Sequence, residues 1–418
     1  MYLKIRTNFE YLAKYFFIFI MLADTGFLLL INLSAQNQRM IGGLSVVIAF
    51  GFLVYIFMKP SFHEKALLHN RFLIMFLVYN IVAMIIHWIY AMVTYSIPWF
   101  NVFMAGHSYF SLIIVPVFLL VFYEWNNSFD KVLMVVAYVG VICACIVIFS
   151  GVCIDIGLPV LFKGISFGYR NGHARIAYSS ISYFAIFYFG DKILNLQTDK
   201  KMKIRYLFYV LLMLGGMVIY VSTRIMIISV ACALVGALLL SDIGNRKKIV
   251  IIVLGVFLVF AGNVFQTMIN SFSLDSDKGA STLARLMALE YYKGLFLEKP
   301  FIGIGLVSPI RDDLVSLIYG PIGVFAFTDL GFLGGLYRFG IIGVPVFVAP
   351  IIRMAFISTR MLLSKCKYST LCISVTIFLV VNQISLNYLD FGRNIVSSFY
   401  WALLEFIYFK EYYSKKYL

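Results

Sequence analysis

The chain has 418 residues, of which 62% are hydrophobic and only 13% are charged. Soluble domains carry about 25% charged residues, so this composition excludes a soluble globular protein and predicts an integral membrane protein. The net charge of +15 does not indicate nucleic-acid binding, because most lysines and arginines fall in short loops on one side of the predicted membrane.

Apolar runs recur along the whole chain, and each can cross roughly 30 Å of hydrocarbon as an α-helix that rises about 1.5 Å per residue. We predict an all-α, polytopic membrane protein that forms a single transmembrane domain over residues 1–418, with about twelve transmembrane helices. In chain order these are 15–33, 40–58, 72–95, 105–123, 132–154, 175–194, 204–221, 225–240, 249–266, 336–352, 370–388 and 395–409.

The loops after the even-numbered predicted helices are basic, whereas the other short loops carry almost no charge. This positive-inside pattern predicts that both termini are cytoplasmic. A basic segment precedes the first helix without a small-residue cleavage site, which predicts an uncleaved anchor.

Two predicted outer loops are long, residues 155–174 and residues 267–336, and the second lies between helices nine and ten. In that loop Ser281 precedes LARLMALEYYKGLFLE, where apolar residues recur at helical spacing until Pro300 ends the run. We predict an amphipathic helix at the outer membrane surface.

Motifs of soluble enzymes are absent or out of context. GISFG at residues 164–168 matches a nucleophile elbow, which requires a preceding strand and a following helix in an α/β sheet, but it lies between predicted membrane helices. The sequence has no P-loop, no HExxH and no metal-spaced carboxylates, and its six cysteines indicate neither a disulfide framework nor a metal site. We therefore expect neither a metal nor a cofactor.

A second group of basic residues breaks the positive-inside pattern, because it lies in the two long outer loops and at outer helix ends. Arg224 stands in an apolar stretch, at the break between helices seven and eight. A guanidinium group donates paired hydrogen bonds to phosphate, each contributing about 1.5–3 kcal/mol, and a helix start also favours an anion. The pattern favours a membrane lipid that bears pyrophosphate. Alternatively, Arg224 lies at the membrane interface and extends its guanidinium group into water without binding a ligand.

Four segments resemble, in order, the O-antigen polymerase and ligase superfamily, over about residues 165–343. They are ISFGYRNGHARIAYSS, VSTRIMIISVACALVGALLL followed by a basic loop, STLARLMALEYYKGLFLEKPFIGIG and TDLGFLGGLYRFGIIG. The resemblance lies in a Ser-x-Arg that opens a helix, an outer-loop arginine helix that ends in Pro and Gly-x-Gly, and a downstream Gly-Ile-x-Gly.

The resemblance implies a GT-C-like glycosyltransferase of the bacterial inner membrane, with a periplasmic active face. Such an enzyme joins undecaprenyl-pyrophosphate-linked oligosaccharide repeats of O-antigen or capsule without metal or nucleotide sugar, and a chain-length regulator is an expected partner. Arg224 and Arg285 match the family's arginines near the donor pyrophosphate. The further candidates for substrate binding are Arg170, Arg175, His173, Glu290, Arg311 and Arg393.

One departure from the family pattern concerns Asp329. Ligases place a histidine eleven residues before the first glycine of Gly-Ile-x-Gly, and counting back from Gly340 gives Asp329. Aspartate can act as the general base toward a sugar hydroxyl. Because the ligase histidine is absent, we expect a polymerase rather than a ligase that transfers polymer to lipid A core. A lipid-linked oligosaccharide flippase, a transporter that catalyses no reaction, is the alternative function.

Asp329 also has a structural alternative, in which its side chain is the N-cap of a helix that begins near Leu330.

Overall fold

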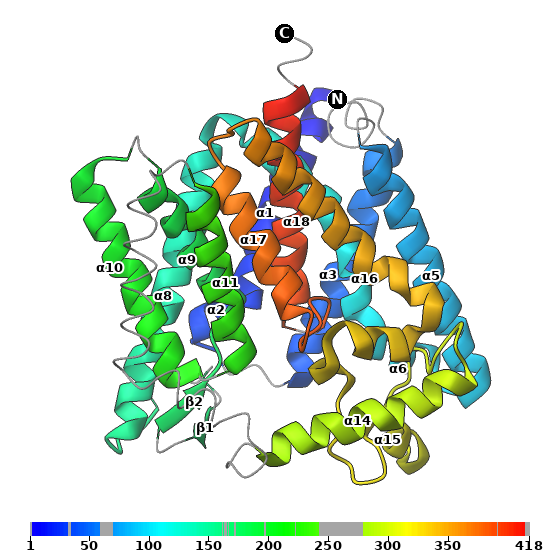
Figure 1. Cartoon of the computed structure of the whole chain (residues 1–418). Helices are drawn as coiled ribbons and strands as arrows, with labels where there is room; N and C mark the ends of the chain where they lie inside the picture. The colour runs from blue at the N-terminus through cyan, green and yellow to red at the C-terminus, as the bar shows by residue number, and fades with distance from the viewer. Residues whose placement is uncertain are drawn as a thin grey trace.

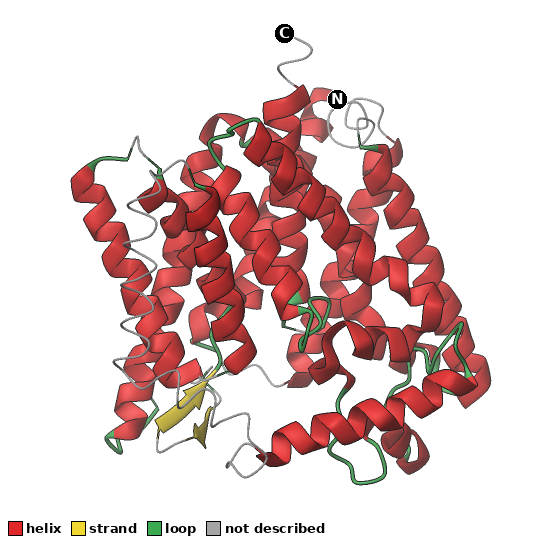
Figure 2. Cartoon of the chain, in the orientation of Figure 1, coloured by secondary structure: helices red, strands yellow, loops and turns green. Residues whose placement is uncertain are grey.

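The computed structural model describes residues 2–31, 35–58, 70–160, 162, 165, 167–170, 173–195, 198–221, 223–241, 279–390 and 392–413. Within these ranges the chain is a bundle of helices with one two-stranded sheet (Figures 1 and 2). A helix pairs its own backbone polar groups, which a hydrocarbon environment requires. The prediction of an all-α membrane protein is confirmed.

The first half of the described chain contains most of the long helices. Its elements are α1 (Tyr2–Asp24), α2 (Gly26–Leu29), α3 (Ala35–Met58), α5 (Arg71–Tyr95), α6 (Trp99–Gly106), η2 (His107–Ile114), α7 (Val115–Glu124), η3 (Asn126–Ser128), α8 (Phe129–Asp155), β1 (Phe167–Arg170), β2 (His173–Ile176), α9 (Ser180–Leu194) and α10 (Lys200–Gly216).

The second half contains the helices that surround the site described below. Its elements are η4 (Met217–Val221), α11 (Arg224–Leu240), α14 (Gly279–Glu298), α15 (Asp312–Tyr319), η5 (Phe327–Leu330), α16 (Gly331–Leu363), α17 (Ser369–Asn382), α18 (Asn394–Tyr408) and η6 (Phe409–Tyr413).

Six described helical segments are long and apolar enough to cross a membrane, and α11 and α17 are shorter apolar helices. The predicted helix 249–266 lies outside the described residues, and each of the other predicted spans coincides with one or more helices. The total of twelve spans stays a prediction. The six long segments are Gln36–Met58, Arg71–Tyr95, Trp99–Glu124, Asn126–Asp155, Lys200–Val221 and Phe327–Leu363.

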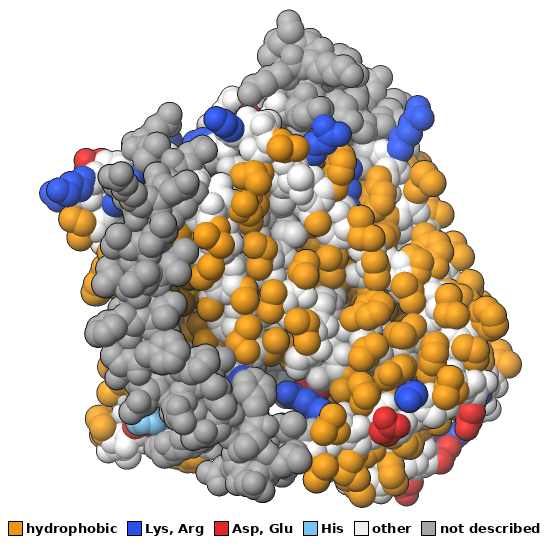
Figure 3. All heavy atoms as spheres, viewed as in Figure 1, with side chains coloured by type: hydrophobic (Ala, Val, Ile, Leu, Met, Phe, Trp, Pro, Cys, Tyr) orange, Lys and Arg blue, Asp and Glu red, His pale blue; other side chains and the backbone are white. Residues whose placement is uncertain are grey.

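The bundle has two distinct ends. Helix α1 begins and η6 ends at one of them, which we call the terminal end, and α14, α15 and the β-hairpin lie at the opposite loop end (Figure 1). On the face shown in Figure 3, hydrophobic side chains cover the middle of the molecule and lysine and arginine side chains gather at the terminal end. The cytoplasmic location of the termini stays a prediction.

Helix α18 forms the centre of the bundle. Every residue from Asn394 to Tyr408 is buried, and α18 contacts α1, α7 and α16. A helix that is apolar on all sides is expected inside a bundle. The N-terminal end of α18 therefore provides a fixed wall at the loop end.

The long outer loop is attached to a kink in α16. Gly340 has φ +60°, and an added Cβ atom there would lie 2.4 Å from the backbone of Phe301. Beyond the kink, Ile341 N donates to Pro300 O at 2.9 Å and Ile342 N donates to Phe301 O at 3.1 Å. Only glycine adopts this conformation without strain, so the Gly-Ile-x-Gly motif holds the end of α14 against α16.

The predicted amphipathic helix is present as α14, which begins two residues before Ser281 and ends just before Pro300. It lies across the loop end (Figure 1). Tyr292 is fully buried and its ring stacks on Phe327 of η5 at 3.8 Å, whereas Leu286 is about half exposed. Stacking on η5 places one face of α14 beside Asp329.

Two predicted boundaries were wrong. The sixth predicted span begins at Arg175, but residues 173–176 form strand β2, which pairs antiparallel with β1, and the helix starts at Ser180. Alternating side chains in FGYR and HARI fit a pleated strand, and Asn171-Gly172 between them in the sequence is typical of a hairpin turn. The first predicted span, 15–33, was placed too late, because α1 begins at Tyr2 and ends at Asp24.

Candidate functional site

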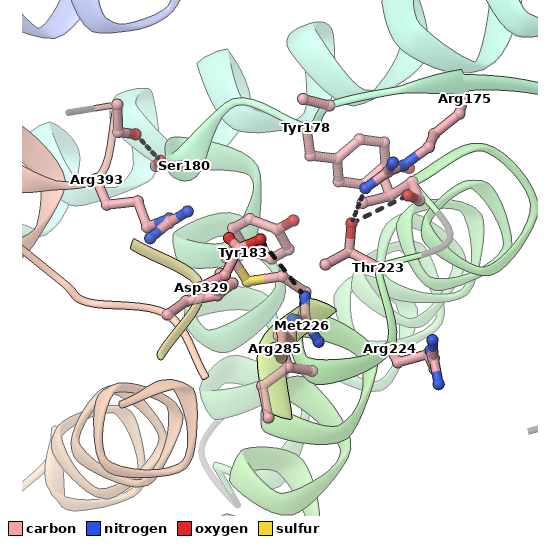
Figure 4. A pocket seen from close by; sticks show the side chains of 15 residues that line it. Arg175, Tyr178, Ser180, Tyr183, Thr223, Arg224, Met226, Arg285, Asp329 and Arg393 are labelled. Atoms are coloured by element: carbon pink, nitrogen blue, oxygen red, sulfur yellow. Dashed lines mark hydrogen bonds and ion pairs between the residues drawn. The ribbon is translucent and has the colours of Figure 1, made fainter. Parts of the chain in front are cut away.

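A cavity of about 380 Å³ opens at the loop end of the bundle (Figure 4). Four arginines and one aspartate line it, and they come from five separate segments of the chain. The lining residues are Arg175, Ala177, Tyr178, Ser180, Tyr183, Val221, Thr223, Arg224, Ile225, Met226, Arg285, Asp329, Leu386, Gly392 and Arg393. We call this space the arginine cavity.

Arg224 is the first residue of α11, as predicted from the apolar stretch that it interrupts. The preceding residue, Thr223, has an extended backbone and is the N-cap position. The unpaired N–H groups of a first helical turn carry partial positive charge. Arg224 therefore adds a formal positive charge to the N-terminal end of α11, which already favours anions. In Figure 4 its guanidinium points away from Arg285 and Asp329.

Arg285 reaches the cavity from α14 and faces Asp329 of η5. Arg285 Nη2 lies 3.9 Å from Asp329 Oδ2, and the two side chains are 40% and 45% exposed. Exposed pairs of this kind contribute about 0–1 kcal/mol. Arg285 Nε is buried and has no hydrogen-bond partner among the described residues. Because the contact to Asp329 is longer than a hydrogen bond and the side chain is 40% exposed, the guanidinium group keeps donor capacity for a ligand.

Asp329 does not cap α16. The N-cap residue of α16 is Leu330, and no side chain makes a capping hydrogen bond there. The structural alternative of an Asp329 cap is therefore wrong, and the carboxylate faces the cavity instead.

Arg175 is presented by strand β2. Gly168 and Arg175 are paired in the hairpin register, and Arg175 Nη2 donates to Thr223 Oγ1 at 3.5 Å. This contact connects the hairpin to the residue that precedes α11. The hairpin thus brings a third guanidinium to the same cavity as Arg224.

The Arg393 guanidinium is held in position by contacts with buried groups on the side away from the cavity. Its Nη1 donates to Asn387 O at 3.0 Å and lies 3.5 Å from Asp390 Oδ2. Asp390 is buried, and Tyr109 OH donates to its Oδ1 at 2.9 Å. Arg338 Nη1 in turn donates to Tyr109 OH at 3.2 Å. This chain of contacts fixes the Arg393 guanidinium at the cavity wall.

The other predicted site residues do not line the cavity. His173 Nδ1 lies 2.8 Å from Asp155 Oδ2, and Arg311 donates to both carboxylate oxygens of Asp313 at 3.1 and 3.0 Å. Glu290 is exposed on α14. Arg170 ends strand β1, but its side chain lies outside the described part of the structure.

Several cavity residues were not predicted from the sequence. Tyr178 lies just before α9, Ser180 and Tyr183 lie in its first turns, and Thr223 and Met226 lie on either side of Arg224 in the sequence. The Asn-Gly pair that follows β1 in the sequence could have identified the first three, because Asn-Gly is typical of a β-hairpin turn. A hairpin at this point places the start of the next helix after Ser179, and serine is a common N-cap residue.

The arginine cavity suits a ligand with more than one negative charge. Four arginines and a single aspartate line the cavity, and guanidinium forks match phosphate oxygens in pairs. Among the described residues no cluster of histidine, cysteine, aspartate or glutamate is suited to a metal ion. The chemistry that these residues themselves offer is electrostatic stabilisation together with one candidate base.

No protein-family model matches the chain, and no curated protein aligns with it. The fold and the cavity define an all-α membrane protein with an arginine-lined cavity at the loop end of its bundle.

Proposed function

We propose that this chain is a polysaccharide polymerase of the bacterial inner membrane, which joins undecaprenyl-pyrophosphate-linked oligosaccharide repeat units of O-antigen or capsule on the periplasmic side. One observation carries the proposal, namely that one cavity is lined by four arginines, Arg175, Arg224, Arg285 and Arg393, together with Asp329. A diphosphate needs several guanidinium donors at once.

The distribution of charge supports a periplasmic orientation for the cavity. The cavity lies at the loop end, opposite the end where α1 begins and η6 ends (Figure 1). Lys192 and Lys367 lie within 4 Å of Asp130 at the terminal end. An excess of lysine and arginine marks the cytoplasmic side of a membrane protein, so the arginine cavity is assigned to the opposite side.

The proposed reaction is a displacement at the anomeric carbon of the donor sugar. An acceptor hydroxyl forms the new C–O bond, and the bond from that carbon to the pyrophosphate oxygen breaks with its electron pair. Asp329 takes the hydroxyl proton, and the lipid diphosphate leaves with one additional negative charge. Arg285 and Arg224 stabilise that charge, and loss of one such donor typically lowers the rate by about 10²–10³.

The pairing of Arg285 with Asp329 suits both roles. At 3.9 Å the guanidinium holds the Asp329 carboxylate beside the cavity, where the carboxylate can accept the proton of an acceptor hydroxyl. Because the pair is exposed and long, a diphosphate can replace the carboxylate as the partner of Arg285 at small cost. Arg224 lines the same cavity and therefore adds a further positive charge near the anion.

The test is complementation of a polymerase-null strain, with polysaccharide gels as the readout. The Arg224→Ala and Arg285→Ala variants are expected to leave lipopolysaccharide with a single repeat unit. Arg311→Ala is the matched control, because Arg311 is also an outer-loop arginine but pairs with Asp313 away from the cavity. Long polymer from well-expressed Arg224 and Arg285 variants would remove the assigned site.

The same gels separate the alternative functions. Loss of a ligase leaves bare lipid A core, whereas loss of a polymerase leaves core with one repeat. A flippase makes no bond, so the purified wild-type protein would move lipid-linked repeats across a liposome membrane without lengthening them.

A further inference from the structure

A second, smaller cavity adjoins the arginine cavity. It has a volume of about 90 Å³ and lies between the end of α1, helix α3 and the start of α18. Gly392 lines both cavities, and a Cβ atom added at Gly392 would meet no heavy atom within 4 Å. Gly392 therefore borders both cavities.

The second cavity differs from the first in charge. Its polar lining comes from Asp24, Gln38, Ser45 and Asn394, and none of its described lining residues is basic. We call it the Asp24 cavity. A phosphate would meet a carboxylate there without a compensating cation, so this cavity does not suit the anionic part of a lipid-linked substrate.

Two polar side chains of the Asp24 cavity, Asp24 and Ser45, have unused hydrogen-bonding capacity. Asp24 Oδ2 is buried and has no hydrogen-bond partner among the described residues. Ser45 donates its hydroxyl proton to Ile41 O at 2.8 Å, which leaves the hydroxyl oxygen able to accept. Buried carboxylate oxygens are normally hydrogen-bonded, so the unpaired Oδ2 points to a ligand that donates hydrogen bonds.

The backbone beside Asp24 is held in an unusual shape. Phe27 and Leu28 have φ values of +50° and +62°, which side chains other than glycine rarely adopt. Thr25 stabilises this turn, because its Oγ1 accepts from Leu28 N at 3.1 Å and donates to Leu22 O at 2.7 Å. Strained turns of this kind concentrate at ligand sites. The turn ends α1 at Asp24 and sets the cavity wall.

We infer that the Asp24 cavity binds a sugar ring of the acceptor chain, beside the donor pyrophosphate in the arginine cavity. A sugar ring supplies hydroxyl donors for Asp24 and both donors and acceptors for the amides of Gln38 and Asn394. The cavity of about 90 Å³ corresponds to about six water-sized positions, which suits one sugar ring. The assignment of this sugar as the acceptor rests on the proposed polymerase function, but the assignment of a sugar site does not.

The experiment measures thermal shifts of the full-length protein in lipid nanodiscs with two probes. One probe is the repeat-unit oligosaccharide released by mild acid from the polysaccharide of the host strain, and the other is inorganic pyrophosphate. The test variants are Asp24→Asn, which keeps the side-chain shape, and Gln38→Ala, which alters a half-buried residue. Asp313→Asn is the control, because this exposed carboxylate lies outside both cavities.

We expect the oligosaccharide to bind about tenfold more weakly, or worse, to Asp24→Asn and Gln38→Ala than to wild type and Asp313→Asn. All four proteins should bind pyrophosphate equally. Unchanged oligosaccharide affinity in both test variants overturns the inference, as does the absence of any oligosaccharide shift in wild type. Failure of pyrophosphate to bind, or its binding equally well to Arg285→Ala, counts against the proposed function and leaves the sugar result intact.

Discussion

Two arginine–carboxylate pairs in this protein have opposite surroundings. Arg353 of α16 binds Glu405 of α18 through two hydrogen bonds of 2.8 and 2.9 Å, and the two side chains are 16% and 2% exposed. Arg285 and Asp329 meet through one contact of 3.9 Å, and both side chains are at least 40% exposed. The first pair is buried and inaccessible to a ligand, so we call it the closed pair, and the second is accessible, so we call it the open pair.

The neighbours of the two pairs make the same distinction. Glu405 also accepts hydrogen bonds from Asn70 Nδ2 at 2.7 Å and Trp401 Nε1 at 3.1 Å, and the Arg353 guanidinium lies over the ring of Tyr408. In the open pair, Arg285 Nε has no partner among the described residues. A buried arginine whose donors are used holds helices together, whereas a cavity arginine with an unused donor is available to a ligand. Four predictions test this contrast, in order of decreasing effect.

The largest effect is expected from breaking the closed pair. Glu405→Ala leaves the Arg353 charge buried without its carboxylate, which should destabilise the protein by about 3–5 kcal/mol. Thermal unfolding in nanodiscs measures this loss. The double variant Arg353→Met/Glu405→Leu replaces both charges with apolar groups and should recover most of the stability. A single variant as stable as wild type would contradict a structural role for this pair.

Breaking the open pair should affect rate rather than stability. Arg285→Ala is expected to slow polymerisation by about 10²–10³, while the free energy of unfolding changes by no more than about 1 kcal/mol. Turnover of purified protein with lipid-linked repeats gives the rate. If Arg285→Ala instead lowers the stability strongly and does not specifically lower the rate, Arg285 has a structural role like that of Arg353, and the prediction is wrong.

A smaller effect is expected from the buried support behind Arg393. Asp390→Asn keeps the side-chain shape but removes the negative charge 3.5 Å from Arg393 Nη1. We expect KM for the lipid-linked donor to rise about tenfold, equivalent to about 1.4 kcal/mol, with a smaller change in kcat because the side chain of Asp390 does not line the cavity. Asp155→Asn serves as the control, since Asp155 contacts His173 outside the cavity. A loss confined to kcat would argue against a positioning role.

The smallest effect is expected from Arg311. Its guanidinium donates to both carboxylate oxygens and thereby lowers the pKa of Asp313. Any stability from this pair is present above the unfolded-state pKa of the carboxyl group and is lost as the pH falls through the lower folded-state value. Thermal unfolding of wild type and Arg311→Ala between pH 7 and about pH 2 should differ slightly at neutral pH and converge at acid pH. Polymer length should not change.

The local features of the fold were predictable because hydropathy and capping act over short distances. The apolar runs predicted α3, α5 and α8 within a few residues, and the spacing of apolar residues before Pro300 predicted α14. The β-hairpin was missed because FGYR and HARI are short, and a hydropathy window merged the second strand with the following helix. Attention to Asn171-Gly172 would have separated them.

The individual arginines were predictable, but their environments were not. The positive-inside rule singles out Arg175, Arg224 and Arg285 as exceptions, and all three line one cavity. Nothing local indicates that Arg311 is paired by Asp313 while Arg285 keeps an unused nitrogen. The Asp24 cavity depends on contacts between residues about 370 positions apart in the sequence, and pattern reasoning carries no information at that range.

The burial of α18 has a consequence for how the protein is made. The helices that enclose it, including α1, α7 and α16, all precede it in the chain. During synthesis these helices enter the membrane first and must surround an unfilled centre, with Arg353 lacking its carboxylate. Insertion of α18 then fills the centre of the bundle. Quality-control proteases should therefore degrade chains that end before Asn394 far more readily than full-length chains.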